Sequence, residues 1–248
     1  MKYLILMGCC FALTNCIAQN NAKTDSVIRS ILGAENVTRL TGEGTELIKQ
    51  NDFSGASLFF SNEIKKDDGN REAYFNRGIV NIVLADTMAA CRDWSAVLAL
   101  GDTATFKLLD SHCQGSMFIA DDTLPKIVYR KMFAIEKGKD AGYVSAKVVV
   151  QQMPEFTGGP DGVFKYLKTN MNYPALAKQK KVQGTVYVNF IIDKKGKVLF
   201  PYIVRGIDKD CDKEALRLIK NMPQWKPGKN NGKPVIVRHN LPVIFSVK

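Results

Sequence analysis

One alternating stretch near the end of the chain constrains the possible folds more than any other feature. Every second position of it is apolar, at Val186, Val188, Phe190 and Ile192. A period of two is typical of a β-strand with one buried face. Residues 193–197 predict a turn, in which Gly196 can adopt a positive φ, and residues 198–205 predict the returning strand. The sequence therefore predicts an antiparallel hairpin.

Helices are expected on both sides of this hairpin. Residues 158–161 predict the start of a helix that continues through Leu167, with Phe164 and Leu167 on one face. A second, short helix is expected at 175–181. A third helix follows the hairpin, and one face of it is apolar, with Ala215, Leu218, Ile219 and Met222.

A cluster of acidic residues stands at the start of the third helix. Its members are Asp208, Asp210, Asp212 and Glu214. The spacing lacks the glycine and the distal glutamate of a calcium loop, whereas acidic side chains stabilise the positive end of a helix. We therefore expect the cluster to complement the helix end, and we expect neither a metal site nor a cofactor.

Two further strands are expected at the borders of this region. The first covers residues 147–152, and the last runs from Pro234 through Phe245 after a loop at 228–232. Pro242 has no amide donor, so it favours an edge strand or a bulge. Trp225, between two prolines, is expected to pack on the sheet.

The motifs within residues 146–248 together resemble the C-terminal domain of TonB-family proteins. Three of them carry the resemblance: Tyr173-Pro174 before the second helix, Gly184 before the hairpin, and Trp225-Lys-Pro-Gly228 before the last strand. The resemblance implies an α+β domain with the element order β-α-α-β-β-α-β. Its helices would cover one face of a small antiparallel sheet.

The resemblance also implies a function. In that family the domain crosses the periplasm and holds a short extended peptide of an outer-membrane transporter against its exposed last strand, which supports energy-dependent transport. Carried over to this sequence, the partner-binding residues are Val235, Ile236, Val237, Arg238, Val243, Ile244 and Phe245. An edge strand offers unpaired amide and carbonyl groups to an incoming strand, so this mode of binding also has a physical basis.

The first eighteen residues predict an export signal that is cut after Ala18, which makes the protein periplasmic. Lys2 precedes an apolar run that is shorter than the roughly 20 residues needed to span a bilayer. Two alternatives stay open: a lipid-modified Cys16, or a retained segment that anchors the protein in the inner membrane. A retained anchor would make an ExbB and ExbD type motor an expected partner. However, the chain lacks the long proline-rich spacer of energy-transducing members.

Removal of the signal leaves three cysteines, Cys91, Cys113 and Cys211, in an oxidising compartment. Because three is an odd number, at most one pair can form. We expect a disulfide between Cys91 and Cys113, which stand on neighbouring predicted helices, and a free Cys211. Two buried free cysteines are the alternative for the first pair.

The part before the C-terminal domain predicts all-α tetratricopeptide-like repeats over residues 22–114. Ala56 and Phe60 recur 34 residues later as Ala90 and Trp94, at the length of that repeat, and Gly78 stands where two helices pack closely. End helices are expected at 25–40 and 103–114. Aromatic residues in this region are expected to be core rather than ligand contacts. Residues 115–145 are expected to be a linker, in which periodicity does not decide between strand and helix for 127–135.

Positive charge is concentrated in the C-terminal half. Residues 146–248 contain 19 Lys and Arg against 7 Asp and Glu, whereas residues 19–145 contain 15 against 17. A basic surface favours acidic partners or simply keeps a protein soluble, and no motif for nucleic acid accompanies the charge. The alternative function is therefore an envelope scaffold, in which the repeats bind partners and the basic domain docks to an envelope polymer.

Catalysis is not expected. The chain has only two histidines, His112 and His239, and it lacks a nucleophile motif and a metal-ligand spacing. Cys211 is a poor nucleophile candidate, because the carboxylates beside it raise a thiol pKa.

Overall fold

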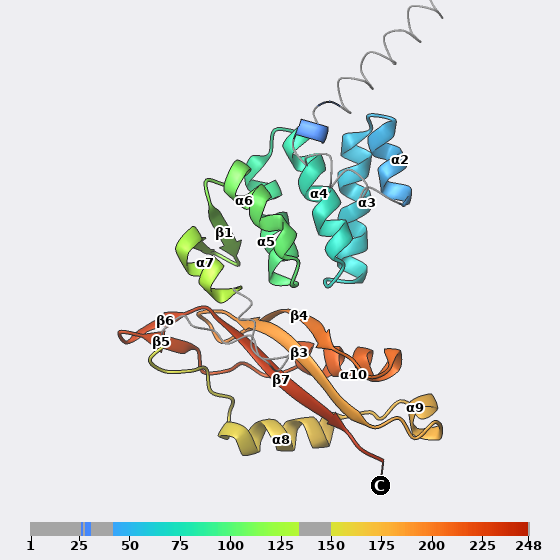
Figure 1. The fold of residues 1–248 in the computed structure, drawn as a ribbon, viewed down its shortest axis with the longest axis vertical. Helices are drawn as coiled ribbons and strands as arrows, with labels where there is room; N and C mark the ends of the chain where they lie inside the picture. The colour runs from blue at the N-terminus through green and yellow to red at the C-terminus, as the bar shows by residue number, and fades with distance from the viewer. Residues whose placement is uncertain (1–25, 27, 31–41, 134–149, 248) are drawn as a thin grey trace, which may run out of the picture. The chain divides into compact units, whose positions relative to one another are not determined.

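The computed structural model describes residues 26, 28–30, 42–133 and 150–247, which belong to two compact units (Figure 1). The helical unit contains the described residues up to Val97 together with Thr105–Gln114. The C-terminal unit contains Leu98–Ala104 and the described residues from Gly115 onwards. The expected export signal at 1–18 and most of the expected front helix at 25–40 lie outside the described residues. No helix in the described part is long and apolar enough to cross a membrane.

Antiparallel helical pairs build the helical unit. The helices are α2 (Glu43–Lys49), α3 (Phe53–Lys66), α4 (Arg71–Val83) and α5 (Thr87–Ala99), followed by the 3₁₀ turn η2 (Thr103–Thr105) and α6 (Phe106–His112). The starts of α3 and α4 are capped by the side chains of Asp52 and Asn70, which accept hydrogen bonds from the amides of Gly55 and Ala73. These caps explain why helices begin there.

Close packing between α4 and α5 confirms the role predicted for Gly78. A Cβ atom on Gly78 would lie 2.4 Å from Nε1 of Trp94, so a larger residue would force the helices apart. Ala56 and Ala90 are both fully buried, and so is Trp94. The helix pairs therefore match the predicted spacing, while the tetratricopeptide resemblance itself stays a prediction.

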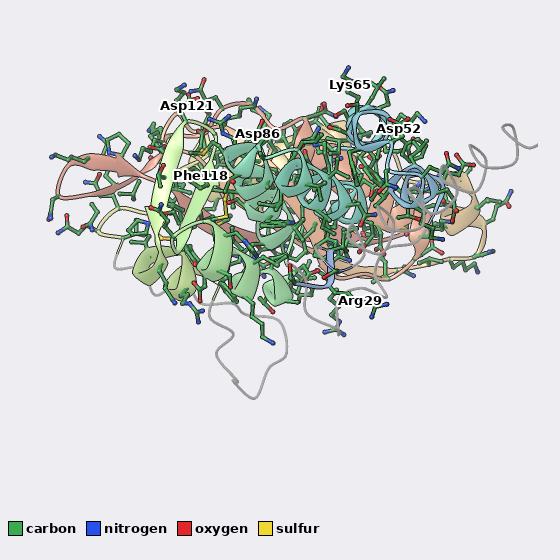
Figure 2. The ribbon with its side chains drawn as sticks, turned by 90° about the horizontal axis from the view of Figure 1, so that it is seen from above. Arg29, Asp52, Lys65, Asp86, Phe118 and Asp121 are labelled. Carbon is green, nitrogen blue, oxygen red and sulfur yellow. A yellow bond between two sulfur atoms is a disulfide. The ribbon has the colours of Figure 1, made fainter. Side chains whose placement is uncertain are left out.

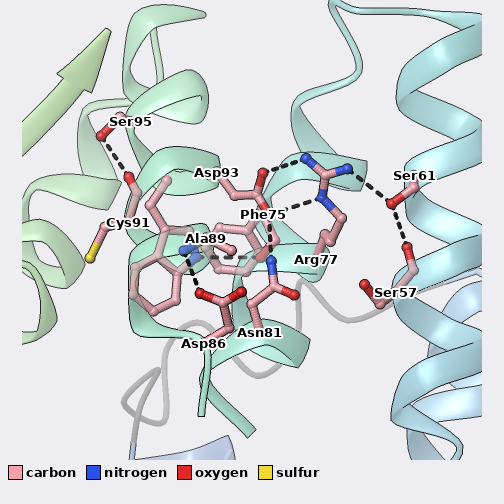
Figure 3. A network of polar contacts seen from close by, with 11 residues as sticks. Ser57, Ser61, Phe75, Arg77, Asn81, Asp86, Ala89, Cys91, Asp93 and Ser95 are labelled. Carbon is pink, nitrogen blue, oxygen red and sulfur yellow. Dashed lines mark hydrogen bonds and ion pairs between the residues drawn. The ribbon is translucent and has the colours of Figure 1, made fainter. Parts of the chain in front are cut away.

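A polar network ties together α3, α4 and α5 (Figure 3). The Arg77 guanidinium donates through Nε and Nη2 to both carboxylate oxygens of Asp93, at 3.0 and 2.6 Å, and through Nη1 to Ser61 Oγ at 3.0 Å. Asn81 donates a further hydrogen bond to Asp93 at 3.0 Å. Because the Asp93 side chain is almost completely buried, its charge depends on these donors.

We predict that Arg77→Leu lowers the free energy of unfolding of the helical unit by about 3 kcal/mol, because it leaves the buried Asp93 carboxylate without its cation. Urea unfolding monitored by circular dichroism would measure the change. The double variant Arg77→Leu/Asp93→Leu should be less unstable than the sum of the single changes. Strict additivity of the two would contradict the coupling.

The predicted disulfide is confirmed: Cys91 and Cys113 are bonded, and Cys211 is free and buried. The bond joins α5 to the residue that follows α6, across a sequence separation of 22 residues. The bond therefore holds the end of α6 against α5.

We predict that the variant Cys91→Ala/Cys113→Ala loses about 3 kcal/mol of stability, since the disulfide closes a loop of moderate length in the unfolded chain. Reductant should shift the urea midpoint of the wild-type protein to that of the double variant and leave the variant unchanged. Equal midpoints for oxidised and reduced wild-type protein would show that the bond contributes nothing.

An antiparallel three-stranded sheet forms the centre of the C-terminal unit. The strand order is β4 (Val198–Arg205), β3 (Gly184–Ile192) and β7 (Val237–Phe245), with β3 in the middle (Figure 1). The hairpin expected from the alternating sequence is thus confirmed as β3 and β4. The helices α8 (Gly159–Asn170), α9 (Ala175–Gln179) and α10 (Lys209–Lys220) match the three expected helices. Trp225 is buried in the same core, as expected.

Both faces of β3 are buried in its second half, although the alternation predicted only one buried face. The first face carries Val186, Val188, Phe190 and Ile192, which pack with residues of α8, α9 and α10. The second face carries Asn189 and Ile191, which are also buried. The alternation missed this second layer because residues distant in sequence cover it.

The expected last strand is divided in two. Residues 233–235 form β6 (Lys233–Val235), which pairs with β5 (Gly228–Asn230) in a separate ribbon, and β7 begins only at Val237. The expectation of a loop at 228–232 was therefore wrong for its first half. For the strand expected at 147–152, the described residues show only an isolated bridge from Gln152 to Lys229.

The region expected to be a linker has secondary structure in its described part. It contains the hairpin β1 (Ser116–Ile119) and β2 (Asp122–Pro125), followed by α7 (Lys126–Met132). Figure 2 shows Phe118 on the hairpin and Asp121 at its turn, where Asp121 lies 3.2 Å from Lys195 Nζ. Asp122 pairs with Lys194 in the same way. Lys194 and Lys195 lie in the β3–β4 turn. The described residues 115–133 therefore belong to the C-terminal unit and do not form a free linker.

Candidate partner-binding edge of the sheet

The strand β7 offers a regular open edge. It pairs with β3 at nine consecutive positions, from Gly184 opposite Phe245 to Ile192 opposite Val237, without a register shift. Among the described residues, no strand pairs with its other side. An open and regular edge is the surface that strand addition requires.

The opposite edge of the sheet, β4, is irregular. Its pairing with β3 shifts register twice, Phe200 has a positive φ of 50°, and Pro201 follows directly. Bulges and prolines twist an edge strand away from further pairing. Of the two edges, β7 is therefore the better template for an incoming strand.

The predicted site residues do not all lie on this edge. Val237, Arg238, Val243, Ile244 and Phe245 belong to β7. By contrast, Val235 pairs with Gly228 in the β5–β6 ribbon. Ile236, which is buried, lies in the chain between the end of β6 and the start of β7. The structure thus places the predicted set on two different ribbons.

The proline in β7 indicates which main-chain groups face outward. Within a sheet, proline is accommodated where its missing N–H points away from the neighbouring strand. Pro242 therefore faces the open side, and the main-chain groups of Arg238 and Ile244 share its direction because strand geometry repeats every two residues. Side chains alternate as well: Val243 and Phe245 are buried in the core, while Ile244 is 59% exposed.

The Arg238 side chain is committed to contacts inside the C-terminal unit. Its guanidinium donates to Asn189 Oδ1 at 2.7 Å, to the Met132 carbonyl oxygen at 3.3 Å and to the Tyr202 hydroxyl, and it lies 4.6 Å from the centre of the Phe133 ring. The side chain is 8% exposed. Arg238 can therefore offer a partner its main chain but not its charge, which the sequence did not indicate.

His239 connects β7 to the core. Its ring lies 5.4 Å from that of Phe190 and 5.3 Å from that of Trp225, measured between centroids. Burial lowers the pKa of His239 below its ordinary value. The folded C-terminal unit therefore favours the neutral imidazole over the protonated form.

We predict that acid destabilises the C-terminal unit through His239. Above about pH 6.5 the imidazole is neutral in both the folded and the unfolded chain. Below that value the unfolded chain binds the proton more readily, so the free energy of unfolding falls until the lowered folded pKa is reached. Urea unfolding, monitored by the amide signals of β3 at pH 7 and pH 5.5, would show the loss. His239→Gln should remove it, and His112→Gln, in the helical unit, should not.

The other titratable cluster has a structural role. The Asp208 carboxylate caps α10 by accepting from the amides of Asp210 and Cys211, and Asp212 accepts from the amide of Ile207. Burial, and then these carboxylates, raise the pKa of the Cys211 thiol, as predicted. Within the described ranges, no group of three His, Cys, Asp or Glu side chains could hold a metal ion.

The sheet with its three helices defines a small α+β domain, and comparison with known families identifies the type. Residues 169–247 match the family model described as Gram-negative bacterial TonB protein C-terminal. A solved structure, the Helicobacter pylori TonB C-terminal domain determined by NMR, is similar with 20% identity and a TM-score of 0.28, over 35% of this chain and 78% of that chain. No curated protein matches the chain.

The family match confirms the resemblance predicted from the sequence. It covers about a third of the chain and identifies the C-terminal domain as TonB-like. The matched range contains α9, β3, β4, α10 and the whole of β7.

Proposed function

We propose that the C-terminal unit is a peptide-binding module that pairs an extended segment of another protein with the open edge of β7. The observation that carries the proposal is the regular ladder between β7 and β3, with no described strand on the second edge of β7. The incoming segment would satisfy the outward main-chain groups of β7, and its alternate side chains would set specificity.

The proposed partner is the N-terminal segment of an outer-membrane TonB-dependent transporter. The family match at residues 169–247 supports this class of partner, since it places a TonB-type domain around β7. The protein would act in the periplasm, where it would support energy-dependent transport. The helical unit would hold the module or recruit a second protein.

The strand-addition geometry also suits mechanical work. Several main-chain hydrogen bonds along one edge share a force directed along the strand, whereas contacts between exposed side chains break singly. The Arg238 contacts and the nine paired positions with β3 fix β7 in the sheet, so a pull on the peptide would be transmitted to the unit as a whole.

We predict that Ile244→Pro weakens the binding of transporter peptides by about tenfold, because it removes an outward amide donor and places a ring where the added strand lies. The measurement is a titration of the intact protein with synthetic peptides that copy the N-terminal segments of the host's outer-membrane transporters, followed by amide NMR shifts.

Val204→Pro, on the bulged edge β4, is the matched control and should bind as the wild type does. The wild-type shifts should centre on residues 237–245. Shifts that avoid β7, together with binding that depends only on lysines, would overturn the proposal and favour the scaffold alternative.

A further inference from the structure

An apolar groove of about 600 Å³ lies beside the last half of β7. Its walls come from α8 and the residues after it, from α9, and from the end of β7, and they include Phe164, Lys168, Met171, Lys178, Pro242 and Ile244. The volume is within the usual range of binding pockets. The groove therefore adjoins the residues whose main chain faces the open edge.

The helix α8 makes the groove apolar by exposing a large aromatic side chain. Leu167 is buried in the same core as Val243 and Phe245, which places α8 on the face of the sheet that those side chains occupy. Phe164, which the sequence placed on the same helix face as Leu167, is 65% exposed instead. It lines the groove with Met171 and Ile244. Exposed apolar side chains that gather in one groove, as Phe164 and Ile244 do, mark a binding surface, whereas single ones do not.

The position of the groove matches that of an added strand. Neighbouring strands lie about 4.8 Å apart, and their side chains point alternately to the two faces. A strand added to β7 would thus direct every second side chain to the face that α8 covers. Those side chains would enter the groove beside Phe164.

Two lysines give the groove its charge. Lys168 and Lys178 are both exposed, and no ion pair involves either of them among the described residues. The groove thus combines an apolar floor with a positive rim, which favours a partner that carries both apolar side chains and a carboxylate.

We propose that this groove selects the partner segment: it takes the alternate apolar side chains of the strand added to β7, and Lys168 and Lys178 attract an acidic residue of the same segment. This inference rests on the proposed function, because the groove would contact the side chains of a strand that β7 has bound. The occupant is an extended segment of a different protein with an apolar residue at every second position.

A second copy of this chain fits the groove less well. Paired edge to edge, it would bring the residues of its own β7, Val237–Phe245, which include no acidic residue. The positive rim would then meet no carboxylate. Charge therefore favours another protein over self-association.

Three peptides of ten residues with blocked ends would serve as probes. The first alternates leucine with serine and ends in two glutamates, the second replaces the glutamates with lysines, and the third replaces the leucines with serines. The wild-type protein should bind the first peptide with shifts at 237–245. Its affinity for the second should be several-fold lower at low salt. Its affinity for the third should be at least about tenfold lower.

The protein variants separate the groove from the edge. Phe164→Ser should weaken the first peptide about tenfold, and Lys168→Glu should reverse the preference between the first and second peptides. Leu176→Ser and Lys165→Glu change an exposed leucine and an exposed lysine outside the groove lining, so they should bind as the wild type does.

The outcomes distinguish the two proposals. If the peptides shift β7 and Ile244→Pro weakens their binding, but Phe164→Ser and Lys168→Glu behave as their controls do, the groove inference is wrong and the proposed function stands. If no peptide, including the transporter segments, shifts β7, both fail. Dimerisation of the wild type that Phe164→Ser abolishes would assign the groove to a second copy and overturn the inference.

Discussion

The pairing of β3 with both of its neighbours is the constraint on which the rest of the C-terminal unit depends. The second half of β3 is buried on both faces, and nine consecutive positions pair the strand with β7. A strand in this central position cannot offer an edge, so recognition is left to β4 and β7. The bulges of β4 then leave β7 as the regular one.

An open edge is a hazard as well as a binding surface, because it can pair with any exposed strand. Features that limit such pairing lie close to β7: Pro242 removes one outward donor, and Lys168 and Lys178 place positive charge nearby. Arg238 secures the strand from the other face through Asn189. The edge is thus held rigid and remains open to a partner, and its selectivity comes from its surroundings.

Local patterns predicted much of this fold. The alternation at 186–192 and the glycine in the following turn were sufficient to predict the hairpin, and Pro242 indicated an edge strand. Gly78 predicted close helix packing, which its position against Trp94 confirms. The β5–β6 ribbon was missed, since three-residue strands carry too little periodicity to be recognised. The burial of the second face of β3 was missed as well, because Asn189 on that face contacts Arg238, and Arg238 in turn contacts Met132 and Phe133, all distant from it in sequence.

The sequence by itself determined the β3–β4 hairpin and the helices α8, α9 and α10, because the period of apolar side chains follows from backbone geometry within a few residues. Only the tertiary structure decided that β7 and not β4 is the regular edge, that Arg238 points inward to Asn189 and Phe133, and that Phe164 stays exposed in the groove that Ile244 also lines. These properties depend on partners that are distant in sequence. A pattern along the chain reports which side of an element is apolar, but not what lies against it.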